Sequence, residues 1–377
     1  MNDSVNIIIG ADVLPTESNK KLFESGKASQ IMQQELLDCW NSADLRIFNL
    51  EAPVFDGYSP IKKCGPTLKI GTKCMLGVSA LKPDLVLLAN NHILDHGLKG
   101  LHSTIDEFAK YEINYVGVGE RIESVKKYHE FEQGGIRIGI YNCAEHEFSI
   151  ATSNSAGANP FDALDSFDDV AYLKTRNDYV VVCFHGGKEF YQYPSPMLQK
   201  IFRKFADRGA DVVIAQHTHC IGCEERYKNS VLIYGQGNFI FENEELLSKK
   251  SLLCKLVFAK ERMTVEYIPI LLNKGVCELS PSSSEIMDEF LHRSKEIRED
   301  GFVVNKYGSF AKENIALYLR LLKGNGIIWK IFSKVSAKSF LRCFCKLSNI
   351  LCIRNFVETE AHRELLLAGI KDEIDQR

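Results

Sequence analysis

The chain has 377 residues, of which 45% are hydrophobic and 25% charged, and its formal net charge is −3. These values match ordinary globular proteins and exclude a disordered or fibrous chain. A net charge this close to zero gives no general attraction to nucleic acid. The length predicts two or three domains.

The sequence also carries information about the cellular compartment. The start of the chain has neither the basic segment nor the long apolar segment of a signal peptide. No stretch approaches the roughly 18 uninterrupted apolar residues of a spanning helix. Without a secretion signal, the twelve cysteines are expected to be reduced thiols. We therefore predict a cytoplasmic protein.

Short apolar segments alternate with helical patterns from Val5 to Ile270. The predicted strands are Val5–Ile9, Leu45–Asn49, Leu85–Ala89, Tyr115–Val118, Ile136–Asn142, Tyr179–Phe184, Val212–Ala215 and Val231–Tyr234. The predicted helices include Lys20–Asp38, Leu98–Lys110 and Pro196–Arg208. This alternation predicts an α/β fold with buried sheets. A polar segment, Thr152–Asp169, predicts a long loop that is a candidate lid. Residues 277–285 predict a linker, followed by helices to the end.

Polar residues of similar chemistry follow five of the predicted strands. They are Asp12, Glu51, Asn91, His92, Asp95, His185, His217 and His219. Because ligand and catalytic residues gather at the carboxyl edge of open α/β sheets, we expect these side chains to lie together.

Carboxylate, amide and imidazole ligands suit divalent Mn, Fe, Zn or Mg ions. Two such ions about 3.5–4 Å apart can bind a phosphoryl group and activate a water molecule. Glu51 could bridge them, and His92 could act as an acid oriented by Asp95.

Each of these residues, taken alone, also has an ordinary structural interpretation. A single histidine near a strand end is more often hydrogen-bonded than metal-bound, and Asp12 or Glu51 could be a helix cap or a turn residue. His217 and His219 alone are a moderate metal signal, because alternate residues of an extended segment point to one side. The shared position of all the residues favours a metal site.

The motifs resemble those of a known family. They are Gly10-Ala11-Asp12, Asn49-Leu50-Glu51, Asn90-Asn91-His92 with Asp95 and Gly97, His185-Gly186-Gly187-Lys188-Glu189, His217-Thr218-His219 and Gly237-Asn238-Phe239. Their order resembles the CapA family of bacterial capsule-synthesis proteins, a branch of the calcineurin-like metallophosphatases. The resemblance runs from Val5 to Ile270.

This resemblance implies a four-layer sandwich, with two sheets flanked by helices, over residues 1–276. It implies one or two divalent ions held by Asp12, Glu51, Asn91, His185, His217 and His219, with His92 and Asp95 as the catalytic pair. Leu14 and Gln216 stand where the superfamily has His and Gly, and Glu51 stands where it usually has Asp. The position of Leu14 leaves one ion with fewer protein ligands.

Two functions follow as expectations. The first is a metal-dependent hydrolase, phosphoesterase-like or acting on amide bonds, whose partner is a capsule or polysaccharide precursor or polymer such as poly-γ-glutamate. The second is a non-catalytic assembly factor of a membrane-associated synthesis complex. No nucleic-acid partner is expected, because no recognition module is present.

The C-terminal helical region, 286–377, supports the second function. From Arg320 to Arg354 the chain has eight Lys or Arg residues and no Asp or Glu. Five of them recur at i+4 spacing: Lys330, Lys334, Lys338, Arg342 and Lys346. A basic amphipathic helix suits the anionic inner face of a membrane, whereas the alternative is a helix docked on the main domain with its basic face in water.

Overall fold

The computed structural model describes residues 4–322 and 347–358, together with the single residues 362, 370 and 374. Contacts divide the chain into two compact units, Met1–Val303 and Val304–Arg377. The first unit contains every predicted site residue.

The strands of the first sheet are β1 (Ser4–Leu14), β2 (Leu45–Leu50), β3 (Leu85–Leu87), β4 (Tyr115–Val116), β13 (Asn238–Phe241), β14 (Lys250–Ala259), β15 (Met263–Asn273) and β16 (Val276–Leu279). They are ordered β16-β15-β14-β1-β2-β3-β4, and β13 pairs with the end of β1. The β1–β4 neighbours run parallel, whereas β14 to β16 pair antiparallel. The sheet is therefore mixed.

The strands of the second sheet are β6 (Tyr128–Gln133), β7 (Ile136–Ala144), β9 (Tyr179–His185), β10 (Val212–Gln216), β11 (Glu224–Tyr227) and β12 (Ser230–Ile233). They are ordered β11-β12-β10-β9-β7-β6, with a parallel centre and antiparallel edges. A separate pair is formed by β5 (Val118–Gly119) and β8 (Gly157–Ala158).

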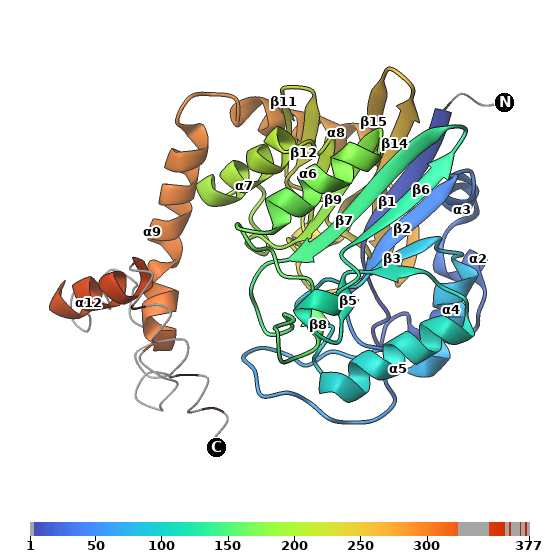
Figure 1. Cartoon of the computed structure of the whole chain (residues 1–377), viewed down its shortest axis with the longest axis horizontal. Coiled ribbons are helices and arrows are strands. Elements are labelled where there is room, and N and C mark those ends of the chain that lie inside the picture. Colours follow the sequence, from blue (N-terminus) through green and yellow to red (C-terminus); the bar gives the residue numbers. More distant parts are fainter. Residues whose placement is uncertain (1–3, 323–346, 359–361, 363–369, 371–373, 375–377) are drawn as a thin grey trace. The chain divides into compact units, whose positions relative to one another are not determined.

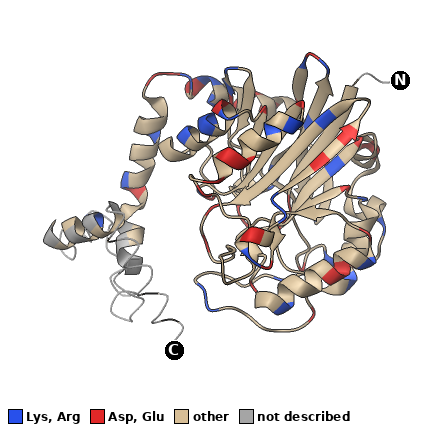
Figure 2. Cartoon of the chain, in the orientation of Figure 1, with Lys and Arg blue, Asp and Glu red and all other residues tan. Residues whose placement is uncertain are grey.

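The helices of the first unit are α1 (Lys20–Glu24), α2 (Ala28–Ile31), α3 (Gln34–Asn41), α4 (Met75–Ala80), α5 (Gly97–Lys110), α6 (Ser166–Arg176), α7 (Pro196–Asp207) and α8 (Ser283–Glu296). Short 3₁₀ turns occur at Thr72–Cys74, Ile122–Ser124 and Leu246–Ser248. Figure 2 shows both charge signs interspersed along α5 and α6, as expected for faces in contact with water.

Alternating strand residues divide the core into three apolar layers. Ile7 and Ile9 of β1 face Val181 and its neighbours in the layer between the two sheets. Ile8 points the other way, into the layer under α1 to α5. On the far side of the second sheet, Val182 packs in the layer beneath α6 and α7. The result is helices, sheet, sheet, helices (Figure 1), which confirms the predicted α/β fold with two sheets flanked by helices.

Two predicted elements have different structures. The helix expected over Lys20–Asp38 is three short helices, because Gly26 adopts φ +69° and Met32 is extended, where it pairs with Cys277. The linker expected at 277–285 instead holds part of β16, with Cys277 fully buried, and the start of α8.

The boundary between the two units also differs from the expected domain limits of 1–276 and 286–377. Phe290 and Ile286 of α8 are buried against Ile221 and Leu252, which places α8 in the first unit. The second unit contains most of α9 (Phe302–Leu322), and α12 (Leu347–Glu358). None of the described helices combines the length and the apolar character that a membrane span requires. The predicted basic residues Lys330–Lys346 lie outside the described residues.

Candidate metal centre

The first sheet brings three polar residues side by side at its carboxyl edge. Asp12 on β1 is paired in register with Asn49 on β2 and with Asn238 on β13. The register shifts next to Asp12 in both pairings, which is the kind of irregularity that redirects a side chain at a functional site. Asn49 Nδ2 donates to Asp12 Oδ1 at 2.8 Å and holds that carboxylate in place.

The second sheet contributes three histidines from two neighbouring strands. His185 is the last residue of β9 and lies opposite Gln216, the last residue of β10. His217 and His219 follow β10 with φ values of +84° and +53°. The prediction that they belong to an extended segment was therefore wrong: the chain turns sharply here. Such backbone conformations cost about 1–3 kcal/mol each for residues other than glycine, and they concentrate at functional sites.

Glu51 lies where the two sheet edges meet. One of its carboxylate oxygens lies 3.5 Å from His185 Nε2 and 3.9 Å from His219 Nε2. Two groups of possible metal ligands share this residue: Glu51 with His217 and His219, and Glu51 with Asp12 and His185. Within each group the ligand atoms lie within 4.8 Å of one another. Asn91 joins the cluster, with its Oδ1 3.0 Å from His185 Nε2. The structure thus brings all six predicted ligands together.

The cluster has buried polar atoms that lack hydrogen-bond partners among the described residues. They are both carboxylate oxygens of Glu51 and the Nδ1 atoms of His185 and His217. Leaving such atoms unpaired costs free energy, so their presence together is evidence of a missing ligand. Acceptor atoms of this kind from carboxylate and imidazole are what a divalent cation binds. The arrangement can therefore hold a metal ion.

The pKa shifts show how the cluster behaves without a cation. Burial and then the charge of Asp12 raise the pKa of Glu51 well above its usual range. Burial lowers the pKa of His185 to about 4 and that of His217 well below its usual value. Burial would also lower the pKa of His219, but the carboxylates of Glu51 and Asp12 outweigh it and raise this pKa. Neutral imidazole at His185 and His217 is the form that binds metals.

Asn238 orients one of the imidazole rings. His219 Nδ1 lies 2.8 Å from Asn238 Oδ1, an acceptor, so the ring carries its proton on Nδ1 and leaves Nε2 as the ligand atom. Asn238 is fixed in turn, because its Nδ2 donates to the carbonyl of Phe241 at 2.9 Å.

The predicted catalytic pair lies beside the cluster and includes a third member. His92 Nδ1 lies 2.6 Å from Asp95 Oδ2, as the spacing predicts. Lys63 donates to Asp95 Oδ1 at 2.5 Å, and its Nζ is 3.2 Å from His92 Nδ1. Sequence reasoning missed Lys63, because it lies in a loop 29 residues before His92 and carries no motif.

Sequence reasoning also missed Glu145, although the rule that ligand residues gather at the carboxyl ends of strands would have identified it. It follows β7 at the edge that supplies His185, and it forms a further possible ligand group with Glu147 and His217. Burial raises the pKa of Glu145 to about 7, although the hydrogen bond that it accepts from the Gly187 N–H acts to lower this pKa.

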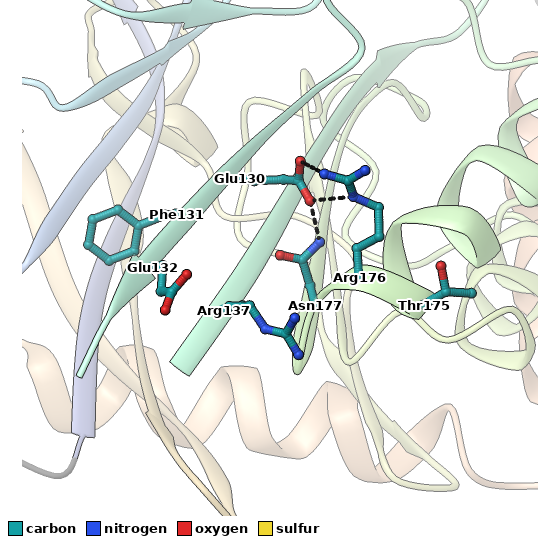
Figure 3. A pocket seen from close by; sticks show the side chains of 7 residues that line it. All are labelled: Glu130, Phe131, Glu132, Arg137, Thr175, Arg176 and Asn177. Carbon is teal, nitrogen blue, oxygen red and sulfur yellow. Dashed lines mark hydrogen bonds and ion pairs between the residues drawn. The ribbon is translucent and has the colours of Figure 1, made fainter. Parts of the chain in front are cut away.

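A cavity of about 470 Å³ opens over the cluster and is lined in part by Asn91, His92 and His219. A separate hollow of about 510 Å³ lies at the edge of β6 (Figure 3), lined by Glu130, Phe131, Glu132, Arg137, Thr175, Arg176 and Asn177. There the carboxylate of Glu130 already accepts hydrogen bonds from Arg176 and Asn177, at 3.0–3.1 Å. Of these two cavities in the described part of the chain, the first joins residues that could hold a metal ion, so we take it as the candidate site.

Comparison with known proteins finds relatives that are named for capsule or PGA biosynthesis. The chain is 30% identical over 195 residues to the "Capsule biosynthesis protein CapA" of Bacillus anthracis, which covers 50% of this chain and 47% of the relative. It is 32% identical over 158 residues to the "PGA biosynthesis protein CapA" of Bacillus subtilis (strain 168), which covers 41% of each. The chain thus spans less than half the length of these two relatives.

Two solved structures are similar at lower identity. One is a phosphatase from Mycoplasma pneumoniae, 15% identical with a TM-score of 0.45, covering 76% of this chain and 98% of the other. Another is the NAD nucleotidase of Haemophilus influenzae, 12% identical with a TM-score of 0.45, covering 82% and 68%. The family model described as "Bacterial capsule synthesis protein PGA_cap" matches residues 6–243. Because that match covers more than half of the chain, the chain belongs to the PGA_cap family of bacterial capsule synthesis proteins.

Proposed function

We propose that this protein is a metal-dependent hydrolase that acts in the synthesis of capsule or poly-γ-glutamate (PGA). The observation that carries the proposal is Glu51, a fully buried carboxylate whose two oxygens have no hydrogen-bond partner among the described residues. Glu51 also belongs to both ligand groups, which is the position that a bridging carboxylate would occupy.

The side chains have two proposed roles: one set binds the metal, and the other transfers a proton. Asp12, Glu51, Asn91, His185, His217 and His219 would hold one or two divalent ions. A bound divalent ion supplies a Lewis acid and makes a water molecule nucleophilic near neutral pH.

His92 is the proposed proton donor to the leaving group. Its Nδ1 bond to Asp95 fixes the ring, and His92 lines the cavity. Glu145, which accepts from the Gly187 N–H, would add a carboxylate to the cluster through its ligand group with Glu147 and His217.

The bond that is cleaved is a phosphoester or the amide of a glutamyl polymer. Support for the amide comes from the name of the Bacillus subtilis relative, a PGA biosynthesis protein. We propose the capsule precursor or polymer as the partner of this cavity.

The test is hydrolysis of two chromogenic probes, p-nitrophenyl phosphate and γ-glutamyl-p-nitroanilide, by protein loaded with Mn²⁺, Fe²⁺, Zn²⁺ or Mg²⁺. We expect turnover of at least one probe, and its loss in His217→Ala. His102→Ala is the matched control, because His102 is half-exposed and pairs with Glu120 away from the cluster. If no metal-loaded preparation hydrolyses either probe, the hydrolase proposal is wrong.

A second candidate function is that of an assembly factor at the inner face of the membrane. Leu317 and Tyr318 of α9, and Leu351 and Phe356 of α12, are apolar or aromatic side chains exposed to solvent. With the basic residues between 320 and 354, they would suit an anionic lipid surface, where each Lys or Arg contributes about 1 kcal/mol. This would place the protein in the cytoplasm, peripheral to the membrane.

Co-sedimentation of the full chain with anionic and with zwitterionic vesicles separates this candidate from the first. We expect binding to anionic vesicles only, and loss of binding in a Lys330→Glu, Lys334→Glu and Lys338→Glu variant. Equal recovery with both kinds of vesicle, or with neither, rejects the membrane role.

A further inference from the structure

A further cavity, of about 400 Å³, lies between α8 and the 3₁₀ turn that precedes β14. We call it the α8 cavity, and the residues that line it all belong to the first unit. Apolar and basic side chains share its lining: Leu246, Leu247, Ile286, Lys249, Lys250 and Arg293. A hollow of this kind, apolar with a few converging polar groups, is typical of a ligand site.

The apolar part of the α8 cavity has a firm floor and an open rim. Ile286 is buried in an apolar cluster with Ile221 and Phe290, which fixes the floor. On the rim, Leu246 is 79% exposed and Leu247 is 43% exposed. These two leucines offer apolar surface that aliphatic groups of a ligand would remove from water.

Arg293 supplies a positive charge that is held in place by the backbone. Its side chain is only 9% exposed, and its Nε and Nη2 donate to the carbonyls of Gly222 and Ile221 at 2.9 Å and 3.3 Å. Its Nη1 lies 3.8 Å from Oε2 of Glu289, which is beyond hydrogen-bond distance, and the Glu289 side chain is 61% exposed. Such a loose, exposed ion pair contributes little, so Arg293 can exchange it for the carboxylate of a ligand.

The lysines make the lining of the α8 cavity positive overall. Neither Lys249 nor Lys250 has a carboxylate within ion-pair distance among the residues that the structure describes. Three cationic side chains of the lining therefore face one carboxylate, that of Glu289. Glu244 and Glu245 precede the same turn but do not line the cavity. A concave surface of this charge attracts anions.

The α8 cavity adjoins the cavity over the metal-binding residues. Three segments of the chain line both: Phe190 and Gln192, His219 and Ile221, and Asn243 and Leu246, where the first of each pair lines the metal cavity. Residues two positions apart are separated by at most about 7 Å, so the two hollows are neighbours. Gln192 Nε2 also donates to the Ile221 carbonyl at 3.3 Å, which joins two of these segments at the boundary.

We propose that the α8 cavity binds the acidic chain of a polymeric substrate whose scissile bond lies at the metal site. Lys249, Lys250 and Arg293 would bind its carboxylates, and the two leucines would contact its methylene groups. A single phosphate would use the charges but leave the leucines exposed. A γ-linked glutamate chain has both features, since each unit carries one carboxylate and places two methylene groups in the main chain. The inference rests on the proposed function, in which an anionic substrate meets metal cations.

The test measures binding of fluorescently labelled γ-linked decaglutamate to the full chain, by anisotropy at low ionic strength. Lys249→Ser combined with Lys250→Ser should weaken binding about three- to tenfold, because two partly exposed ion pairs are lost. Leu246→Ser keeps every charge and should weaken binding at least about threefold through lost apolar contact. The matched control is Lys260→Ser combined with Arg262→Ser, which removes two charges from the exposed turn at the other end of β14. It should keep the wild-type affinity within about twofold.

Equal affinity of the wild type and the cavity variants overturns the inference. So does an equal loss in the control, because charge alone would then attract the polymer. If α-linked decaglutamate binds as tightly as the γ-linked chain, and with the same dependence on the cavity, the occupant is an acidic protein segment and the inference is wrong. Release of glutamate from the γ-linked chain by Mn²⁺-loaded protein is followed in parallel. Cavity-dependent binding without release supports the α8 cavity and rejects cleavage of this polymer instead.

Discussion

The ammonium group of Lys63 lies 2.5 Å from Oδ1 of Asp95, and the two side chains are 2% and 0% exposed. Asp95 also bonds His92 Nδ1, and its Oδ2 accepts from the Leu68 N–H at 2.6 Å. One buried carboxylate therefore ties the loop that carries Lys63 to the segment after β3. This pairing connects the stability of the loop to the geometry of the proposed acid.

Replacing Lys63 by Met should lower the free energy of unfolding by about 3–5 kcal/mol, because the buried carboxylate of Asp95 loses its ammonium partner and keeps only the His92 and Leu68 hydrogen bonds. Urea denaturation followed by circular dichroism measures the change. In the double variant Lys63→Met and Asp95→Asn the loss should be smaller, since the unpaired charge is gone.

Lys99→Met on the exposed face of α5 serves as the control and should change stability by less than about 0.5 kcal/mol. A loss in Lys63→Met no larger than that of the control would show that the ion pair does not stabilise the fold.

The same pairing predicts a dependence of stability on pH. Burial alone would raise the pKa of Asp95, but His92 and Lys63, with the Leu68 N–H, lower it below its ordinary 3.8. A lowered pKa means that Asp95 stabilises the fold above that ordinary value, and that this contribution is lost as the pH falls through the folded-state pKa. The difference in free energy of unfolding between the wild type and Asp95→Asn should therefore become smaller as the pH falls from 5 to about 2. A constant difference over this range would contradict the assignment.

Asn238→Ala should weaken metal binding by about 10–100-fold, because His219 loses the acceptor that fixes its Nδ1 proton and its ring orientation. Competition with a fluorescent chelator measures the affinity. Asn238→Asp keeps an oxygen acceptor at the same position and should retain more of the affinity. If both variants bind metal as tightly as the wild type, Asn238 does not orient the ligand.

Gly235→Ala should disturb the turn that carries the two histidines. Gly235 has φ +139°, and an added Cβ would lie 2.7 Å from Thr218 Oγ1 and 2.8 Å from the carbonyl oxygen of Cys220. Since Thr218 separates His217 from His219, we expect a loss of about 1–3 kcal/mol in stability together with weaker metal binding. Thermal unfolding and elemental analysis measure the two effects. Gly65→Ala has open space around it and is the control for a positive-φ glycine without a steric clash.

Much of the fold could be predicted, because the buried strands are short apolar runs with a clear period. The ligand residues could be located in part for a related reason: parallel strands of one sheet end at one edge, so Asp12 and Glu51 had to be near one another once the strands were known. His185 ends a strand of the second sheet, and the packing of the two sheets brings it to them. The sequence does not show which residues of each motif face the cluster, because this depends on the register shifts beside Asp12. These shifts leave no trace in the sequence.

The parts that could not be predicted depend on tertiary contacts. Lys63 reaches Asp95 from a loop without periodicity, so only the folded chain reveals the pair. The helix expected over Lys20–Asp38 is interrupted because Met32 pairs with Cys277, which lies 245 residues further along the chain. The positive φ values of His217 and His219 override the extended geometry that alternation favours.

Glu51→Gln separates a metal site from an ordinary buried polar cluster. In metal-free protein the substitution should raise the free energy of unfolding by about 1 kcal/mol, because it removes a buried carboxylate that lacks partners in the described structure. In the presence of metal the order should reverse. A cation at 100 times its Kd would stabilise the wild type by about 2.7 kcal/mol, and it would not stabilise the variant, which has lost the shared ligand. Thermal unfolding with and without chelator measures both differences. If metal raises the melting temperature of both proteins equally, Glu51 is not a ligand; if metal raises neither, the cluster does not bind the ion tested.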